Sequence, residues 1–142
     1  MPTLEKEYIE TGKVRFIYRP LGDFANDRSS RLTAESLYCA GEQGKFWEMH
    51  DWLYANESRW LNAGDVVATF VSTAAPEIGL DGTKLGSCLN QERYSSRVIG
   101  FVNDATSRNI YRTPTFLVNG RLLEGALPIE QFRAAIEEAL QK

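Results

Sequence analysis

The stretch Arg112-Thr113-Pro114-Thr115-Phe116-Leu117-Val118-Asn119-Gly120-Arg121-Leu122-Leu123-Glu124 decides how this chain folds. Two short apolar runs, Thr115–Val118 and Arg121–Glu124, flank the dipeptide Asn119-Gly120. Asn and Gly both tolerate the positive φ that a tight two-residue turn needs, which makes this pair a strong signal for a β-hairpin. We therefore expect two antiparallel strands joined at residues 119–120.

Elements on either side of the hairpin complete a small mixed pattern. Residues 2–11 have apolar side chains at helical spacing and end at Gly12, a residue that commonly stops a helix. Residues 14–19 are β-branched and aromatic, alternate for most of their length, and predict a further strand. Pro128 suits the first turn of a closing helix over residues 129–141, because no amide hydrogen is required there.

Between these elements the period changes to that of helices. The sequence predicts about five helices, over residues 30–41, 46–54, 62–75, 83–89 and 92–108. Asp27 and Asp81 are expected to begin the first and fourth of them, and Asn62 or Asp65 the third, which is expected to close before Pro76. No internal repeat or low-complexity linker is present, so we interpret residues 26–108 as a helical insertion in one domain made of residues 1–25 and 109–142.

Composition excludes several classes of protein. The 142 residues carry 16 Lys and Arg against 19 Asp and Glu, a formal net charge of −3, without a clustered basic patch that would bind nucleic acid. The longest apolar run, near residues 66–70, is far shorter than the ~20 residues that span a bilayer. The first residues do not resemble an export signal. We expect no nucleic-acid partner and no membrane span.

The order of elements and four local segments resemble the DsbA-like thioredoxin-fold family of thiol-disulfide oxidoreductases. The most specific segment is residues 112–120, which is similar to the family's Thr-Pro-Thr-Phe strand entry and Asn-Gly turn. Residues 12–16, 39–50 and 124–128 follow the same family pattern. The resemblance covers nearly the whole chain and implies an α/β, thioredoxin-like fold with a helical insertion.

One departure from the family concerns its reactive thiols. Family members begin with a strand followed by Cys-x-x-Cys at a helix start, and this sequence contains no Cys-x-x-Cys. Thiol-disulfide exchange needs a thiolate of lowered pKa and a second thiol to resolve the mixed disulfide. The fold is therefore expected to be incomplete and the chain redox-inactive. In this family's sheet the missing strand would be the central one, between the strands at residues 14–19 and 115–118. Three explanations stay open: truncation of a longer parent protein, direct pairing of these two flanking strands, or a homodimer in which a second copy supplies backbone partners.

Two residues are implied as a substrate-binding site by the resemblance. Pro114 is similar to the family's cis-proline, and Thr113 before it would offer backbone hydrogen bonds to a bound peptide. The alternative is a trans proline that merely begins a strand. Protein or peptide thiols would be the substrates of the parent protein, and the family suggests a periplasmic or other extracytoplasmic location.

The two cysteines, Cys39 and Cys88, match a second, structural disulfide that some DsbA-like proteins carry in the helical insertion. The alternative is two buried free thiols. A nucleophilic Cys39 with His50 as its base is the weaker interpretation, because the two residues lie on different predicted helices. Two Cys and one His fall short of a structural zinc site, so no metal or other cofactor is expected.

Two other groups of side chains have simpler explanations than a site. Trp47, Trp52, Tyr54 and Trp60 predict helix packing more than a peptide groove. Paired glutamates in the first and last helices have no acid/base arrangement typical of a hydrolase. The leading hypothesis is a DsbA-like oxidoreductase scaffold. The alternatives are a non-catalytic peptide-binding or chaperone module, and a relative of glutathione-dependent isomerases.

Overall fold

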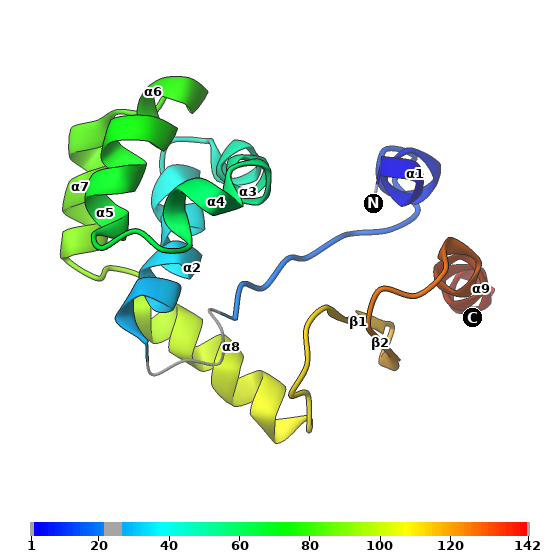
Figure 1. Ribbon diagram of the computed structural model, residues 1–142. Helices are drawn as coiled ribbons and strands as arrows, with labels where there is room; N and C mark the ends of the chain where they lie inside the picture. The colour runs from blue at the N-terminus through cyan, green and yellow to red at the C-terminus, as the bar shows by residue number, and fades with distance from the viewer. Residues whose placement is uncertain (1, 22–26, 142) are drawn as a thin grey trace. The chain divides into compact units, whose positions relative to one another are not determined.

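A computed structural model describes residues 2–21 and 27–141 (Figure 1). Most of these residues are helical, and one two-stranded antiparallel sheet is present among them. The elements are α1 (Pro2–Leu4), η1 (Glu5–Ile9), α2 (Arg28–Gly41), α3 (Phe46–Ala55), α4 (Glu57–Trp60), α5 (Val66–Thr69), η2 (Phe70–Ala74), α6 (Ala75–Ile78), α7 (Gly82–Asn90), α8 (Ser95–Ser107), β1 (Thr115–Val118), β2 (Arg121–Glu124) and α9 (Ile129–Leu140).

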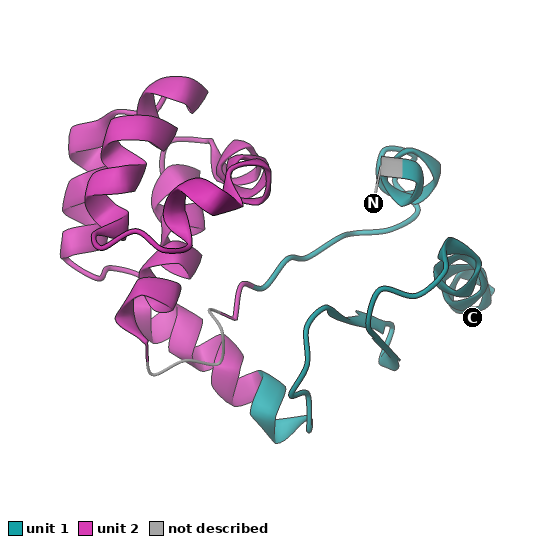
Figure 2. Cartoon of the chain, viewed as in Figure 1, with its two compact units in different colours: residues 1–19, 105–142 teal, residues 20–104 magenta. Residues whose placement is uncertain are grey.

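The chain divides into two compact units, shown in Figure 2. Unit 1 consists of residues 1–19 and 105–142, and unit 2 consists of residues 20–104. No helix within the described ranges is both long and apolar enough to cross a membrane.

Unit 2 is a bundle built on α2. Asp27 accepts from the Ser30 amide at the start of α2, and Asp81 caps α7, as expected. Of the two candidates for the start of the third predicted helix, Asn62 and Asp65, it is Asp65 that caps α5. The core contains large side chains with 2% exposure or less: Leu32, Leu37, Met49, Phe70, Leu85 and Leu89. Helix α7 approaches η2 closely at Gly86, where a Cβ atom would lie 3.2 Å from Val71 Cγ2. A larger residue at position 86 would require the Val71 side chain to shift by a few tenths of an ångström.

The prediction that the third inserted helix closes before Pro76 is wrong. The helix runs through α5, η2 and α6 to Ile78, with Pro76 in the first turn of α6. Segment η2 is a wider, π-type turn, closed by the bond from the Ala75 amide to the Phe70 carbonyl. Such a turn accommodates a proline, which has no amide hydrogen to donate and whose ring clashes with an ordinary helical turn. Gly79, at φ 73°, ends the helix.

In unit 1 the hairpin forms with the predicted turn. β1 and β2 pair antiparallel, with Val118 opposite Arg121 beside the turn. Asn119 and Gly120 have φ of 45° and 90°, the left-handed values that the turn requires. The N-terminal helix also forms, and Gly12 at φ 75° follows its end.

The strand predicted over residues 14–19 is not formed within the described part of the chain. The predicted alternation is present in the burial of the side chains: Val14, Phe16 and Tyr18 are half-buried, and Arg15, Ile17 and Arg19 are exposed. A strand requires a hydrogen-bonded neighbour, and the described sheet consists only of β1 and β2. Periodicity predicted which side chains face inward but could not supply the partner.

Candidate functional site

The loop before β1 places Thr113 and Pro114 side by side at the surface of unit 1. Both residues are exposed, and the peptide bond between them is cis. Thr115 Oγ1 donates to the Arg112 carbonyl at 2.6 Å, and the Gly125 amide donates to the Pro114 carbonyl at 2.8 Å. The loop is thus fastened both to its own strand and to the residue that follows β2.

The outer edge of β1 continues from this loop. In a hairpin with a two-residue turn, the residues flanking the turn form a hydrogen-bonded pair, here Val118 and Arg121. Hydrogen-bonded and non-hydrogen-bonded pairs then alternate along an antiparallel ladder. The backbone amides and carbonyls of Thr115 and Leu117 therefore point away from β2. They form a row of donors and acceptors that an extended chain can pair with.

An apolar core beneath the hairpin positions this edge. Phe116 points inward, and its ring meets that of Phe132 on α9 edge-on, with centroids 4.8 Å apart. Leu123, the cross-strand partner of Phe116, is also buried. The remaining buried members of this core are Leu4, Tyr8, Ala135 and Ile136. The hairpin therefore rests on both the N-terminal helix and α9.

Polar contacts fasten η1 to α9 beside that core. Arg133 Nη2 and Nε donate to the two carboxylate oxygens of Glu7 at 2.6 and 2.8 Å. This guanidinium holds the pKa of Glu7 below its usual range. Tyr8 donates its hydroxyl to Glu137 at 2.8 Å, and this hydrogen bond raises the tyrosine pKa. The two helices are thus fixed relative to one another by two adjacent polar links.

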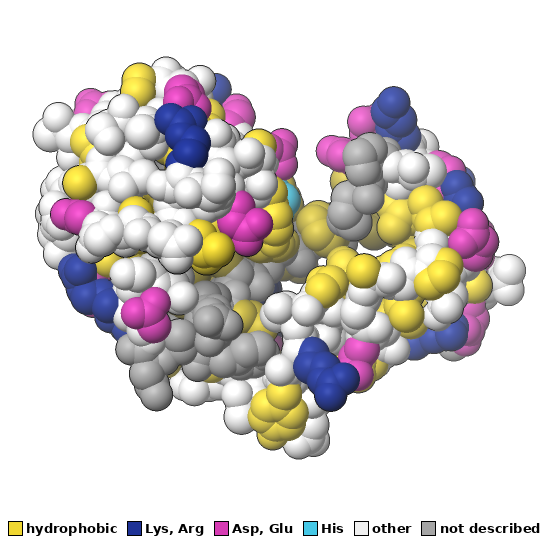
Figure 3. Space-filling model, in the orientation of Figure 1, with side chains coloured by type: hydrophobic (Ala, Val, Ile, Leu, Met, Phe, Trp, Pro, Cys, Tyr) yellow, Lys and Arg dark blue, Asp and Glu magenta, His cyan; other side chains and the backbone are white. Residues whose placement is uncertain are grey.

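The opposite face of the hairpin is open to solvent. Leu117 and Leu122 are cross-strand partners there and are 46% and 44% exposed. In the space-filling view, apolar side chains remain at the surface of both units (Figure 3).

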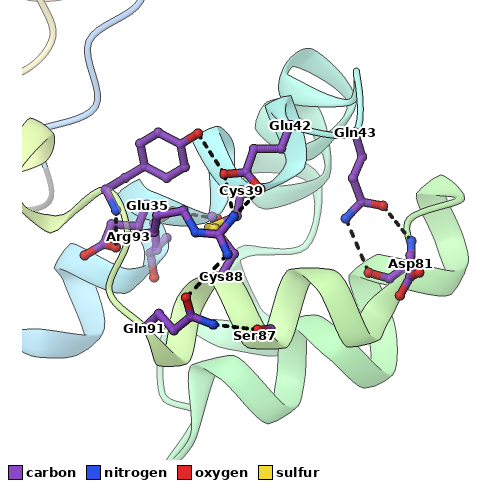
Figure 4. Close-up of a disulfide and its surroundings, with 12 residues drawn as sticks. Glu35, Cys39, Glu42, Gln43, Asp81, Ser87, Cys88, Gln91 and Arg93 are labelled. Atoms are coloured by element: carbon purple, nitrogen blue, oxygen red, sulfur yellow. Dashed lines mark hydrogen bonds and ion pairs between the residues drawn. A yellow bond between two sulfur atoms is a disulfide. The ribbon is translucent and has the colours of Figure 1, made fainter.

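The two cysteines lie in unit 2 and are bonded to each other. Cys39 on α2 and Cys88 on α7 form a disulfide with an S–S distance of 2.04 Å (Figure 4). Both residues have 1% exposure or less. The sequence contains no other cysteine.

His50 has its own contacts on α3. Its Nδ1 lies 2.9 Å from Asp51 Oδ1, and its ring lies between those of Trp47 and Tyr54, at 5.4 and 4.9 Å. Because the Cys39 sulfur is bonded to Cys88, it is not available as a nucleophile with His50 as its base. Across the described ranges, no three His, Cys, Asp or Glu side chains gather as metal ligands would.

The four aromatic residues singled out from the sequence divide into two kinds. Trp52 is buried, Trp60 is half-buried, and both rings meet Phe70 at 6.2 and 6.5 Å. These two belong to helix packing, as predicted. Trp47 and Tyr54 are 46% and 68% exposed and lie on the His50 side of α3.

One buried polar residue, Glu35, has no counterpart among the sequence-based candidates. Its side chain on α2 is fully buried, and it accepts a hydrogen bond from the Tyr94 amide at 3.2 Å. A signal was present, because Arg31 stands four residues before it at ion-pair spacing on the same helix. That spacing usually marks a solvated pair, so it does not by itself predict burial.

Comparison with known proteins gives one family model over almost the whole chain. A model described as Thioredoxin matches residues 1–138. A Salinispora tropica protein named "Na(+)/H(+) antiporter NhaA 3" is 31% identical over 97% of this chain and 20% of its own length. Proteins named "Putative protein-disulfide oxidoreductase" from Rickettsia conorii and Rickettsia prowazekii are 23% and 24% identical over 99% and 98% of this chain. No solved structure matches.

Coverage differs between the two kinds of relative. The chain spans about half the length of the rickettsial proteins and a fifth of the antiporter.

Proposed function

Since the chain belongs to the thioredoxin family, and its α/β fold is an incomplete thioredoxin-like fold of the DsbA-like kind, we propose that it presents the Thr113–Pro114 loop and the outer edge of β1 to cysteine-containing peptides. The family assignment establishes a general thiol-disulfide oxidoreductase scaffold. Peptide binding at this edge, and the absence of exchange chemistry in the chain itself, go beyond that assignment.

The observation that carries the proposal is the backbone of β1. Thr115 and Leu117 direct their amides and carbonyls away from β2, and the exposed Thr113–Pro114 loop continues the same edge. A peptide that adds a strand there gains main-chain hydrogen bonds without needing a deep pocket. A cysteine within such a peptide would lie close to the loop.

The chemistry available to the chain alone is limited by its sulfur atoms. Cys39 and Cys88 are bonded to each other and buried, so neither can attack a disulfide or resolve one. We therefore assign the 142 residues a binding and positioning role, with the reactive thiols supplied from elsewhere. In the rickettsial relatives, whose names suggest protein-thiol substrates, the corresponding region makes up about half of the protein.

A homodimer is the second candidate, favoured by the same feature of β1. An exposed strand edge can pair with the edge of a second copy as readily as with a peptide. In that case the edge would be occupied in concentrated solution, and peptide would compete with self-association.

Binding at this edge can be tested with two leucines that face each other across the hairpin. Proline at position 117 removes an amide donor from the outer edge of β1, whereas proline at position 122 removes one from the far edge of β2. Both wild-type side chains are exposed to nearly the same extent, which makes Leu122→Pro a matched control.

We expect an S-methylated cysteine peptide to shift the amide signals of Thr115 and Leu117 in nuclear magnetic resonance spectra. Leu117→Pro should weaken this binding about tenfold, the effect of about one hydrogen bond, and Leu122→Pro should leave it unchanged. Equal weakening by both variants, or no shift along β1, would refute the proposal. Light scattering on the same samples separates the candidates, because a dimer would dissociate as peptide binds.

A further inference from the structure

Helix α2 presents a line of polar side chains to the turn between α7 and α8. Arg28, Arg31, Glu35 and Glu42 are separated by three, four and seven residues, so they share the face of α2 that also carries Cys39. Figure 4 shows Glu35 and Glu42 on either side of the disulfide, each directed at the segment that follows Cys88.

Contacts from this line hold Glu92, Arg93 and Tyr94 of the turn. Arg28 Nε and Arg31 Nη2 donate to Glu92 at 2.7 and 3.2 Å. Glu42 accepts from Arg93 at 2.7 Å. The turn has a left-handed residue, Glu92 at φ 46°, a conformation that a side chain rarely adopts without support from its surroundings.

Tyr94 donates two hydrogen bonds to this line. Its hydroxyl donates to Glu42 at 2.9 Å, and its amide donates to Glu35 Oε2 at 3.2 Å. Because Tyr94 directly precedes α8, Glu35 and Glu42 together fix the start of that helix on α2.

Glu35 differs from the other members of the line in its surroundings. Its side chain is fully buried, whereas that of Glu42 is one-third exposed. Within the described chain, Glu35 Oε1 and Arg31 Nε are buried and make no hydrogen bond, although they lie 3.8 Å apart. Arg31 thus faces two carboxylates and is hydrogen-bonded to only one of them, that of Glu92.

We propose that Glu35 is a proton-dependent latch on the turn between α7 and α8. With a proton bound, the neutral carboxyl accepts from the Tyr94 amide and leaves Arg31 with Glu92. When the proton leaves to solvent, a negative charge remains in a buried site, and Arg31 is the cation placed to neutralise it. Arg31 would then move from Glu92 toward Glu35. Glu92 would lose its hydrogen bond from Arg31 and keep the one from Arg28.

Charges around Glu35 determine the direction of the pH dependence. Burial is the largest influence and raises the pKa of Glu35; the carboxylate of Glu92 raises it further. The Tyr94 amide, Arg31 and Arg28 lower the pKa but do not cancel this rise. The further titratable and charged groups lie on the turn, on α8 and on the elements packed against α2. They are Glu42, Arg93, Arg97 above the Tyr38 ring, the Lys45–Glu48 and His50–Asp51 pairs of α3, the Asp81–Lys84 pair of α7, and Asp65 at the start of α5.

A raised pKa in the folded state has a definite consequence for stability. The folded chain keeps its proton at pH values where the unfolded chain has lost it. Glu35 therefore favours folding most below the ordinary glutamate pKa. This contribution falls as the pH rises from that value through the folded-state pKa.

Glu42, the residue directly after α2, provides a control of opposite sign. Its hydrogen bonds from Arg93 lower its pKa, so its contribution is present above the ordinary glutamate value and is lost as the pH falls. The variants Glu35→Gln and Glu42→Gln both remove a titrating carboxyl and keep nearly the same shape.

We expect the folding equilibrium constants of the two variants, relative to wild type, to move in opposite directions between pH 4 and pH 7. In denaturant unfolding of the full chain, the relative folding equilibrium constant of Glu35→Gln should rise several-fold as the pH rises. That of Glu42→Gln should fall. Parallel profiles for the two variants would overturn the proposal. Carbon-13 titration of the Glu35 carboxyl in the wild-type chain is an independent measurement, and a midpoint at or below the ordinary glutamate value would also overturn it.

Discussion

Removing the Cys39–Cys88 crosslink is expected to lower the free energy of unfolding by about 4 kcal/mol. The two cysteines are 49 residues apart in sequence, and a crosslink over a loop of this length restricts the unfolded chain to that extent in the loop-entropy model. A loss of this size is a large fraction of the stability of a typical domain. Denaturant unfolding of Cys39→Ala/Cys88→Ala beside wild type measures it.

Wild type in excess reductant is the control for the double variant. Once its disulfide is reduced, it should unfold at nearly the denaturant concentration of Cys39→Ala/Cys88→Ala. Because both cysteines are buried, reduction of the folded protein should be slow and should accelerate when denaturant opens unit 2. A loss below about 1 kcal/mol in the double variant would contradict the prediction that this bond stabilises the fold by restricting the unfolded chain.

Phe70→Ala is expected to cost about 3–5 kcal/mol of unfolding free energy. Phe70 has no exposed surface, lies in the π-type turn η2, and its ring meets those of Trp52 and Trp60. Truncation would leave a cavity between helices that is lined by the indole rings of Trp52 and Trp60. The surrounding residues cannot move far enough to fill it. Thermal or denaturant unfolding, followed by tryptophan fluorescence, measures the loss.

Ser72→Ala is the matched control, because Ser72 lies in the same turn and is exposed. Its change in unfolding free energy should stay within about 0.5 kcal/mol. If Phe70→Ala were as mild as Ser72→Ala, Phe70 would not be a central member of the core of unit 2.

Local signals in the sequence predicted a large part of the fold. The Asn119-Gly120 turn, the Asp27 and Asp81 caps and the helix predicted over residues 30–41 depend on contacts within a few residues. Each forms, and the helix begins two residues earlier than predicted, at Arg28. The resemblance carried by residues 112–120 led to the family that the model over residues 1–138 confirms. Turns, helix caps and helices can be predicted from a single sequence because the residues that form them are close along the chain.

Features that depend on distant partners were not predicted. The wide turn η2 carries the helix past Pro76, and no local pattern distinguishes it from a helix end. Residues 14–19 alternate as a strand does, but strand formation depends on a neighbour elsewhere. In the sequence, Glu35 has the spacing of an ordinary surface glutamate. In the fold it contacts the turn after α7, where the Tyr94 amide donates to it.

The same distinction applies to the candidate site. Thr113 and Pro114 were identified because they belong to the quoted stretch, and they lie together at the start of β1. The outward direction of the Thr115 and Leu117 backbone required the register of the hairpin, which the turn type fixes. Their role in binding peptide stays a prediction.

Turnover by the purified 142-residue chain tests the central claim most directly. In insulin reduction and in the oxidation of a dithiol peptide, we predict no rate above that of buffer, because both sulfur atoms are held in a buried disulfide. Sustained turnover that disappears in Cys39→Ser would contradict the account, since it would show that the chain carries its own reactive thiol.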